Sequence, residues 1–390
     1  MREVVILGAG LHRFGRFPEK SVEEMGREAI WKALQDANVP FRDIEAAYCG
    51  RVLPGAGNGG MGVGLRVITE LGQTGIPVIN FEQACASSST AFREAYLAVA
   101  NGVYDVALVA GFEKMQRGLI QVTETSSYDQ VMGLAVTPSW YAMRARRYIH
   151  DYGATPEMFA QVSVVSHRNG ELNPNAQYQK ACTLEEVMNS RLIADPITLL
   201  QCSPTTDGAG AVVVCAKEKA AQYKSRWVTV VAHACGTGAY VKQMGEDGAL
   251  VSEDPEVMEG PLEKLAKKAY ERASIGPEDV EVAQVHDAFT PGLISAIEAL
   301  SLFNKGEGAR AVWEGKTEIN GKMPVNTDGG LLSRGHPIGA TGTGMIHEIY
   351  RQLMGEAGPR QVKGRKGNGP KVGMVQNSGI GGMNILIFKN

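Results

Sequence analysis

Apolar and polar positions are arranged along the chain in a way that predicts strands and helices in turn. Short, mainly apolar runs predict buried strands, and they lie at residues 4–7, 106–110, 212–215, 228–232 and 372–375. The segment 25–37 instead places apolar side chains at spacings of three and four, which is typical of a helix with one buried face. Alternating strands and helices predict an α/β fold, with a mostly parallel sheet covered on both faces.

One part of this pattern occurs twice. Ala33 to Tyr48 matches Ala269 to Gln284 in register, and each copy predicts a helix, a turn and a strand. After each copy come a glycine-rich stretch, a short strand that ends in Asn, another helix and another apolar strand. Two such copies predict two related units that pack together.

The repeat also predicts the domain organisation. The N-terminal half covers residues 1–117 and is completed by about 190–225, and the C-terminal half covers 226–390. Residues 118–190 between them are more polar and aromatic, and contain helix patterns around Met143 and Phe159. We interpret this segment as an inserted loop domain that contributes to binding.

Composition and charge exclude several classes of protein. The chain has 39 Lys plus Arg against 42 Asp plus Glu, a formal charge of −3, so we expect no general attraction to nucleic acid or anionic membranes. No apolar run approaches the roughly 18 residues of a membrane helix, and the first residues lack the apolar region of a signal peptide. We therefore expect a cytoplasmic protein. The 47 glycines among 390 residues indicate many tight turns.

The six cysteines include no C-x-x-C pair, and no H-E-x-x-H motif occurs, so we expect no metal site. One cysteine has a distinctive setting. Cys85 follows a predicted strand, lies among small residues and opens a predicted helix. Free N–H groups at a helix N-terminus favour a thiolate, which makes Cys85 a candidate nucleophile. The alternative is a buried cysteine at a helix start.

The second copy has His336, between Gly and Pro, at the equivalent place ahead of a helix. If the copies pack about a pseudo-twofold axis, the two helix starts meet and the imidazole could take the thiol proton. His286 follows the repeated strand of this copy, and Asn377-Ser378-Gly379 follows its last strand, with Gly381 close behind. Glycines there leave backbone N–H groups free to face an oxyanion.

Four sequence blocks resemble the thiolase superfamily in order and spacing, and the resemblance covers essentially the whole chain. They are the block around Cys85, His286-Asp287-Ala288-Phe289, Gly335 to Gly342, and the terminal glycine turn. His-Asp-Ala-Phe is more similar to the sterol carrier protein type and archaeal type thiolases than to ordinary thiolases, which have Asn-Glu-Ala-Phe. The resemblance implies duplicated βαβαβαββ units in a five-layered αβαβα fold, with coenzyme A as co-substrate and no metal or redox nucleotide. It also implies a homodimer or tetramer, and for part of this branch a small companion protein with a zinc ribbon and an OB fold.

Carried over residue by residue, the resemblance implies that Cys85 is acylated and that His336 activates it. His336 and His286 would form one oxyanion hole, and backbone N–H groups of Cys85 and of Gly379 or Gly381 would form the other. Ser203 and Phe289 would line the tunnel for the pantetheine of coenzyme A. Ala288 and Ser378 would lie against the substrate.

The sequence departs from the family pattern at the second cysteine. Ordinary thiolases have it ahead of the terminal glycines, where this chain has Asn377-Ser378, and the sterol carrier type is expected to have it where this chain has Ala288. Proton transfer would then fall to His286, His336 or water, which favours an unusual bulky, aromatic or dicarboxylic substrate. We predict a 3-oxoacyl-CoA thiolase of a degradation pathway such as β-oxidation.

Other interpretations stay open. The chain could make acetoacetyl-CoA as an acetyl-CoA C-acetyltransferase, or serve as a scaffold subunit beside the zinc-ribbon companion. Gly57 to Gly62 satisfies the G-x-G-x-x-G pattern of a dinucleotide-binding oxidoreductase, but no strand leads directly into it. A 3-oxoacyl synthase would share the fold, although Gly335-His336-Pro337 favours a thiolase. We interpret Arg144, Arg146 and Arg147 as a solvated helix face.

Overall fold

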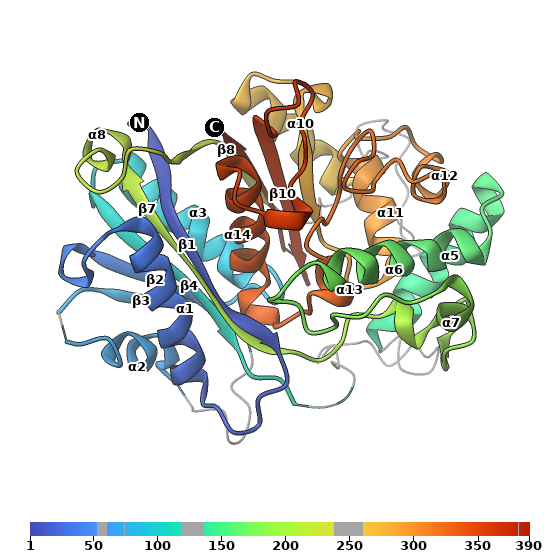
Figure 1. The fold of residues 1–390 in the computed structure, drawn as a ribbon, viewed down its shortest axis with the longest axis horizontal. Helices are drawn as coiled ribbons and strands as arrows, with labels where there is room; N and C mark the ends of the chain where they lie inside the picture. Colours follow the sequence, from blue (N-terminus) through green and yellow to red (C-terminus); the bar gives the residue numbers. More distant parts are fainter. Residues whose placement is uncertain (53–60, 74, 117, 119–135, 238–259, 381) are drawn as a thin grey trace, which may run out of the picture.

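A computed structural model describes residues 1–390 except 53–60, 74, 117, 119–135, 238–259 and 381 (Figure 1). The strands are β1 (Val4–Gly15), β2 (Ala46–Gly50), β3 (Val78–Phe81), β4 (Val106–Glu113), β5 (Leu192–Ala194), β6 (Ile197–Thr198), β7 (Asp207–Ala216), β8 (Val228–Gly236), β9 (Val282–Val285), β10 (Val372–Gly379) and β11 (Gly382–Lys389). The helices are α1 (Val22–Ala37), α2 (Val63–Thr69), α3 (Ser87–Ala100), α5 (Thr137–Tyr152), α6 (Pro156–Glu171), α7 (Leu184–Met188), α8 (Lys217–Ala220), α10 (Pro261–Ala273), α11 (Thr290–Ala299), α12 (Gly308–Trp313), α13 (Gly330–Ser333) and α14 (Thr341–Met354).

Within the described residues, nine strands form one sheet in the order β3-β2-β4-β7-β1-β8-β11-β10-β9. This order repeats outward from its middle, where β1 and β8 pair antiparallel. On either side come two antiparallel neighbours (β7 then β4; β11 then β10) and a parallel strand (β2; β9). Even the outermost position is repeated, since β2 pairs with β3 and Ala283 of β9 bridges to Val325. The sheet therefore confirms the predicted duplication and the α/β class. The prediction of a mostly parallel sheet is wrong, because the strands in the middle of the described sheet, from β4 to β10, all pair antiparallel, and only the outer pairs are parallel.

The helices cover the two halves of the sheet in layers. α1 packs on the outside of the N-terminal half and α10 on the outside of the C-terminal half. α3 contacts β2, β4 and β7, while α14 contacts strands of both halves and also α3. Figure 1 shows α14 between the strands of the two halves. The result is the five-layered αβαβα arrangement that the resemblance implied.

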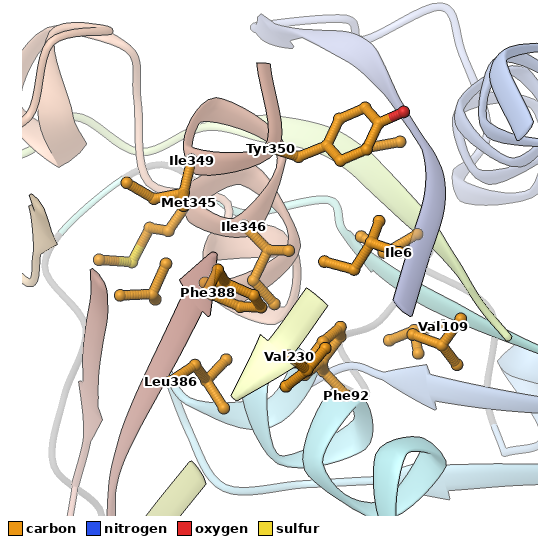
Figure 2. Close-up of a cluster of buried hydrophobic side chains, with 14 of the residues drawn as sticks. Ile6, Phe92, Val109, Val230, Met345, Ile346, Ile349, Tyr350, Leu386 and Phe388 are labelled. Carbon is orange, nitrogen blue, oxygen red and sulfur yellow. The ribbon is translucent and has the colours of Figure 1, made fainter. Parts of the chain in front are cut away.

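Successive side chains of a strand face opposite sides of the sheet. Each strand therefore contributes to two separate cores, one on either side of its layer. Ile6 of β1 points into the central core, together with Phe92 of α3, Ile346 of α14 and Phe388 of β11 (Figure 2). Its neighbours in sequence, Val5 and Leu7, instead pack with α1. The shared central core holds α3 and α14 against each other and so fixes where both helices begin.

The segment predicted as an insertion, 118–190, contributes α5, α6 and α7, and residues 119–135 near its start lie outside the described part of the chain. The small β5–β6 pair follows just after the predicted end of the segment. α6 packs against α11, α12 and α13, and α5 packs against α11. The inserted helices therefore lie beside the C-terminal half. Across the residues that the structure covers, no helix is both long enough and apolar enough to cross a membrane.

Candidate active site

Two helix starts meet at the centre of the molecule. Gly342 at the beginning of α14 allows this contact, because a Cβ there would lie only 2.4 Å from the backbone nitrogen of Ser89. The backbone nitrogen of Thr343 then donates to Ser88 Oγ at 3.1 Å, which links α14 to α3. Cys85 precedes α3 and His336 precedes α14, so this close approach brings the two predicted reacting groups together.

Cys85 Sγ lies 3.2 Å from His336 Nε2. The other ring nitrogen, Nδ1, lies 2.7 Å from Thr341 Oγ1, and that hydroxyl donates its one proton to the carbonyl of Pro337 at 2.9 Å. Thr341 must then accept from His336, so the ring carries its proton on Nδ1. Nε2 is left with a lone pair directed at the thiol, which is the arrangement a general base needs.

Burial disfavours the charged form of both reacting groups. Burial raises the pKa of the Cys85 thiol to about 12, and the residue's own backbone N–H offsets this only in part. Burial also lowers the pKa of His336 well below its usual value, and the nearby His286 and Arg334 lower it further. The backbone N–H at the helix start lowers the pKa of the Cys85 thiol, as expected, but lost hydration raises that pKa by more. The thiolate needs His336 as its base.

His286 lies beside this pair, with its ring centroid 5.3 Å from that of His336. Its Nδ1 is 3.1 Å from the side-chain nitrogen of Asn377, and its backbone nitrogen donates to Gln376 Oε1 at 3.0 Å. Burial, assisted by the charge of Arg334, lowers the pKa of His286 to about 4. His286 is therefore a neutral imidazole at physiological pH.

The end of β10 passes directly beside Cys85. A Cβ at Gly379 would lie 2.1 Å from the carbonyl oxygen of Gln83 and 3.2 Å from the backbone nitrogen of Cys85, so only glycine fits. The Gly379 backbone therefore packs against the backbone of Cys85, and its part in an oxyanion hole stays a prediction. Gly381 lies outside the described residues. Ser378 is partly buried and its hydroxyl accepts from Gln376 Nε2 at 2.6 Å.

The predicted substrate contacts adjoin His286 through one short loop. The backbone nitrogen of Ser203 donates to the carbonyl of Ala288 at 2.9 Å, and Cys202 forms an antiparallel bridge with Phe289. Both Ala288 and Phe289 are buried. Ser203, Ala288 and Phe289 thus lie together, next to His286 in the same loop.

Tyr141, on α5, packs against Phe289. Tyr141 was not identified from the sequence as a site residue. Its ring lies 4.6 Å from that of Phe289, and its hydroxyl makes no hydrogen bond with any residue that the structure describes. Burial and the nearby Cys85 raise its pKa to about 12. Nothing in the sequence distinguishes Tyr141 from the other aromatic residues of the inserted segment.

Glu113 was missed as well, although a lone acid at the end of an apolar strand is a usable signal. It is fully buried, and its Oε2 accepts from the backbone nitrogens of Val52 at 3.0 Å and of Gly339 at 3.2 Å. Glu113 therefore ties the end of β4 to the turn between His336 and α14. This contact fixes the loop that carries the base.

Other sequence expectations concern metals, nucleotides and surface charge. Cys85, His286 and His336 each offer one ligand atom, and these three atoms lie within 4.8 Å of one another. A thiophilic cation could bind to these atoms. Most of the G-x-G-x-x-G segment is outside the described residues. On α5, Arg144, Arg146 and Arg147 are exposed, with Arg144 lying over the ring of Tyr141.

Two family models match the chain. "Thiolase, N-terminal domain" matches residues 4–218, and "Thiolase C-terminal domain-like" matches residues 245–387. Together they account for nearly all of the sequence.

Curated relatives match over almost the full length of this chain. Acetyl-CoA acetyltransferase of Methanothermobacter thermautotrophicus is 38% identical over 97% of both chains. Benzoylsuccinyl-CoA thiolase subunit BbsB of Thauera aromatica is 36% identical over 97% of this chain and 95% of its own. Human sterol carrier protein 2 is 33% identical over 99% of this chain and 71% of its own.

Solved structures share the fold. The Ltp2-ChsH2(DUF35) aldolase superposes with a TM-score of 0.80 at 26% identity, covering 99% of this chain and 97% of that one. Human mitochondrial 3-ketoacyl-CoA thiolase in complex with CoA gives a TM-score of 0.71 at 17% identity, covering 100% of this chain and 98% of that one. The second likeness concerns the fold alone.

Proposed function

Because the chain belongs to the thiolase family, whose members are acyltransferases that use coenzyme A, we propose that it cleaves a 3-oxoacyl-CoA with CoA through an acyl-enzyme on Cys85. The observation that carries this proposal is the 3.2 Å contact between Cys85 Sγ and the unprotonated Nε2 of His336. A thiol facing a neutral imidazole, whose other nitrogen is held by Thr341, is a nucleophile paired with its base.

In the first half of the reaction, Cys85 gives its proton to His336 and the sulfur attacks the 3-keto carbon. The resulting oxyanion accepts from the backbone N–H groups of Cys85 and Gly379, a role supported by the close approach of the two backbones. Collapse of this intermediate breaks the bond between carbons 2 and 3, leaving the acyl group on sulfur. The departing acetyl-CoA enolate is held by His336 and His286, and His336 returns the proton to carbon 2.

In the second half, CoA replaces the departed acetyl-CoA. His336 takes the proton of the CoA thiol, and the CoA sulfur attacks the Cys85 thioester. The oxyanion again accepts from the backbone of Cys85 and Gly379, and its collapse releases acyl-CoA and the Cys85 thiolate, which recovers the proton from His336. Covalent catalysis thus divides one difficult cleavage into two easier steps.

The proposed substrate is a 3-oxoacyl-CoA with a bulky, aromatic or dicarboxylic acyl group. Neither place expected for a second cysteine has one, since this chain has Asn377-Ser378 and Ala288 there. Tyr141 and Phe289 pack ring against ring close to His286, and aromatic side chains there would suit a flat acyl group. The name of the relative BbsB, a benzoylsuccinyl-CoA thiolase subunit, supports the same substrate class.

A second candidate is the condensation of two acetyl-CoA molecules to acetoacetyl-CoA. Two archaeal relatives, 38% and 36% identical, carry the name acetyl-CoA acetyltransferase. A scaffold role beside a catalytic partner is less favoured, because the Cys85–His336 pair is assembled with its hydrogen bonds complete.

We further propose that the protein forms a homodimer or tetramer and works with a small companion chain. Among the described strands, β3 is one of the two terminal strands of the nine-stranded sheet, and its outer edge is unpaired. A strand of a second copy could pair with that edge. The companion is supported by the relative BbsB, which is named a subunit, and by the Ltp2-ChsH2(DUF35) neighbour, which contains two named components.

The test is a panel of 3-oxoacyl-CoAs, including aryl and dicarboxylic ones, assayed with and without co-purifying proteins. Mass spectrometry should find the acyl group on Cys85, and Cys85→Ser should abolish turnover while Cys182→Ser, a matched change away from the site, retains it. An acyl group on another residue would refute the mechanism. Highest activity in acetoacetyl-CoA synthesis would favour the second candidate.

A further inference from the structure

Asn377 occupies a central position in the site that the reaction scheme does not use. Its side chain is fully buried between α3 and the loop of His286. Its nitrogen lies 3.1 Å from His286 Nδ1, and its oxygen lies 2.8 Å from the hydroxyl of Ser89. Asn384 in turn donates to Ser89 Oγ at 3.2 Å and to Thr90 Oγ1 at 2.9 Å. A chain of hydrogen bonds therefore runs from α3 to His286.

The direction of this chain decides where His286 keeps its proton. A neutral imidazole has one N–H, and its other nitrogen accepts. If the amide NH₂ of Asn377 faces His286, Nδ1 accepts and the proton sits on Nε2. If the amide were turned over, its oxygen would accept from Nδ1–H and Nε2 would be bare. The structure has the first orientation: the amide nitrogen of Asn377 faces Nδ1 of His286, and its oxygen lies 2.8 Å from Ser89 Oγ, whose single proton has a second acceptor in the Ala86 carbonyl, also at 2.8 Å.

We propose that Asn377 is a positioning residue that holds His286 in the tautomer with its proton on Nε2, which makes His286 a hydrogen-bond donor to the substrate oxygen and not a base. This inference rests on the proposed function, because only a growing negative charge on the enolate oxygen gives that donor a role. It also assigns the proton transfers. His336, held with a bare Nε2 by Thr341, is then the one base of the histidine pair.

The tautomer also gives a role to the amide in Asn377-Ser378, the pair found where ordinary thiolases have their second cysteine. A cysteine at position 377 would offer His286 a weak donor or a thiolate, neither of which fixes the ring. An amide fixes it without adding charge to a buried site. Because burial holds the pKa of His286 near 4, its Nε2–H persists across the physiological range.

The direct test is the tautomer itself, measured by NMR on protein with ¹⁵N-labelled histidine, with the His286 signals assigned by their loss in His286→Gln. We expect protonated Nε2 and bare Nδ1 in the resting wild-type protein. Protonated Nδ1 in the wild type would overturn the proposal. This measurement does not depend on turnover, so it decides the tautomer even if no 3-oxoacyl-CoA is cleaved and the proposed function fails.

Asn377→Asp is the matched variant, because it keeps the shape but accepts from Nδ1–H. We expect kcat at pH 8 to fall by about 10²–10³-fold, the usual cost of one oxyanion donor. The deficit should shrink at lower pH, because the new carboxylate favours the imidazolium, which regains its Nε2–H. Asn101→Asp, the same change at an exposed helix end, should leave kcat unaltered. Activity of Asn377→Asp within threefold of wild type at pH 8 would overturn the proposal.

A gain of metal binding gives a second readout that mere loss of structure would not produce. In Asn377→Asp, Nε2 of His286 is bare and can join Cys85 and His336 as a ligand, with the carboxylate behind it. Added Co²⁺ should then give thiolate-to-cobalt absorption that disappears in a Cys85→Ser background. Equally tight Co²⁺ binding by wild type and variant would show that Asn377 does not hold the proton on Nε2 against the metal, and would refute the proposal.

Discussion

The neutral resting state of Cys85 predicts an unusual pH profile for its alkylation by iodoacetamide, which reacts with thiolates. With a pKa of about 12, roughly one Cys85 in 30,000 is a thiolate at pH 7.5, against about one in ten for an unperturbed thiol. The alkylation rate should therefore rise close to tenfold per pH unit from pH 7 to pH 10, with no plateau.

The assay follows modification of each cysteine separately by peptide mass spectrometry, because all six are free. Cys182 is the internal control, since it lies outside the site and its pKa is raised to about 11. A plateau for Cys85 below pH 8 would reveal a resting thiolate–imidazolium pair and refute the reasoning. His336→Asn separates the two cases further, because it should leave the steep slope in place if the resting thiol is neutral.

Four further predictions test the site and its support. His336→Asn should lower kcat by about 10²–10⁴-fold, the usual contribution of a general base, and a loss below tenfold in steady-state assays would contradict that role. Thr341→Val should lower kcat about 10–100-fold with little change in KM, because the Nδ1–H loses a partner worth about 1–3 kcal/mol; Thr341→Ser should restore the rate. Gly379→Ala should slow acylation of Cys85 and lower the melting temperature, since the new Cβ would lie 2.1 Å from the Gln83 carbonyl oxygen. An unchanged melting temperature in calorimetry, together with an unchanged acylation rate, would count against this contact. Phe92→Ala should lower the free energy of unfolding, measured with urea, by about 3–5 kcal/mol, because its ring is fully buried in the central core. A decrease under about 1 kcal/mol would mean that the two halves do not share this core as described.

The sequence predicted the fold well because the repeat is a pattern of local elements. Helix and strand periods depend on neighbouring residues, so the match between Ala33 to Tyr48 and Ala269 to Gln284 was enough to predict two related units. Cys85 and His336 could be paired because each precedes the same element in its own copy. Their meeting follows from the symmetry of the copies.

What the sequence could not predict depends on contacts across the chain. Asn377 meets Ser89 and His286 only in the folded molecule, and which way its amide faces is a property of that network. The pKa of the Cys85 thiol depends on burial as well as on its place ahead of a helix, and the burial follows from contacts across the chain. Tyr141 reaches the site from the inserted segment, whose sequence has no repeat partner to indicate its place.

The duplication divides the chemistry between the two halves of the chain. Cys85 belongs to the N-terminal half, whereas His336, His286 and Gly379 all belong to the C-terminal half, and the halves meet through β1 and β8 and through α3 and α14. Neither half alone contains both a nucleophile and a base. Catalytic activity therefore depends on correct packing of the two halves against each other. A chain divided between β7 and β8 should regain activity only when both fragments reassemble, as in a complementation reporter.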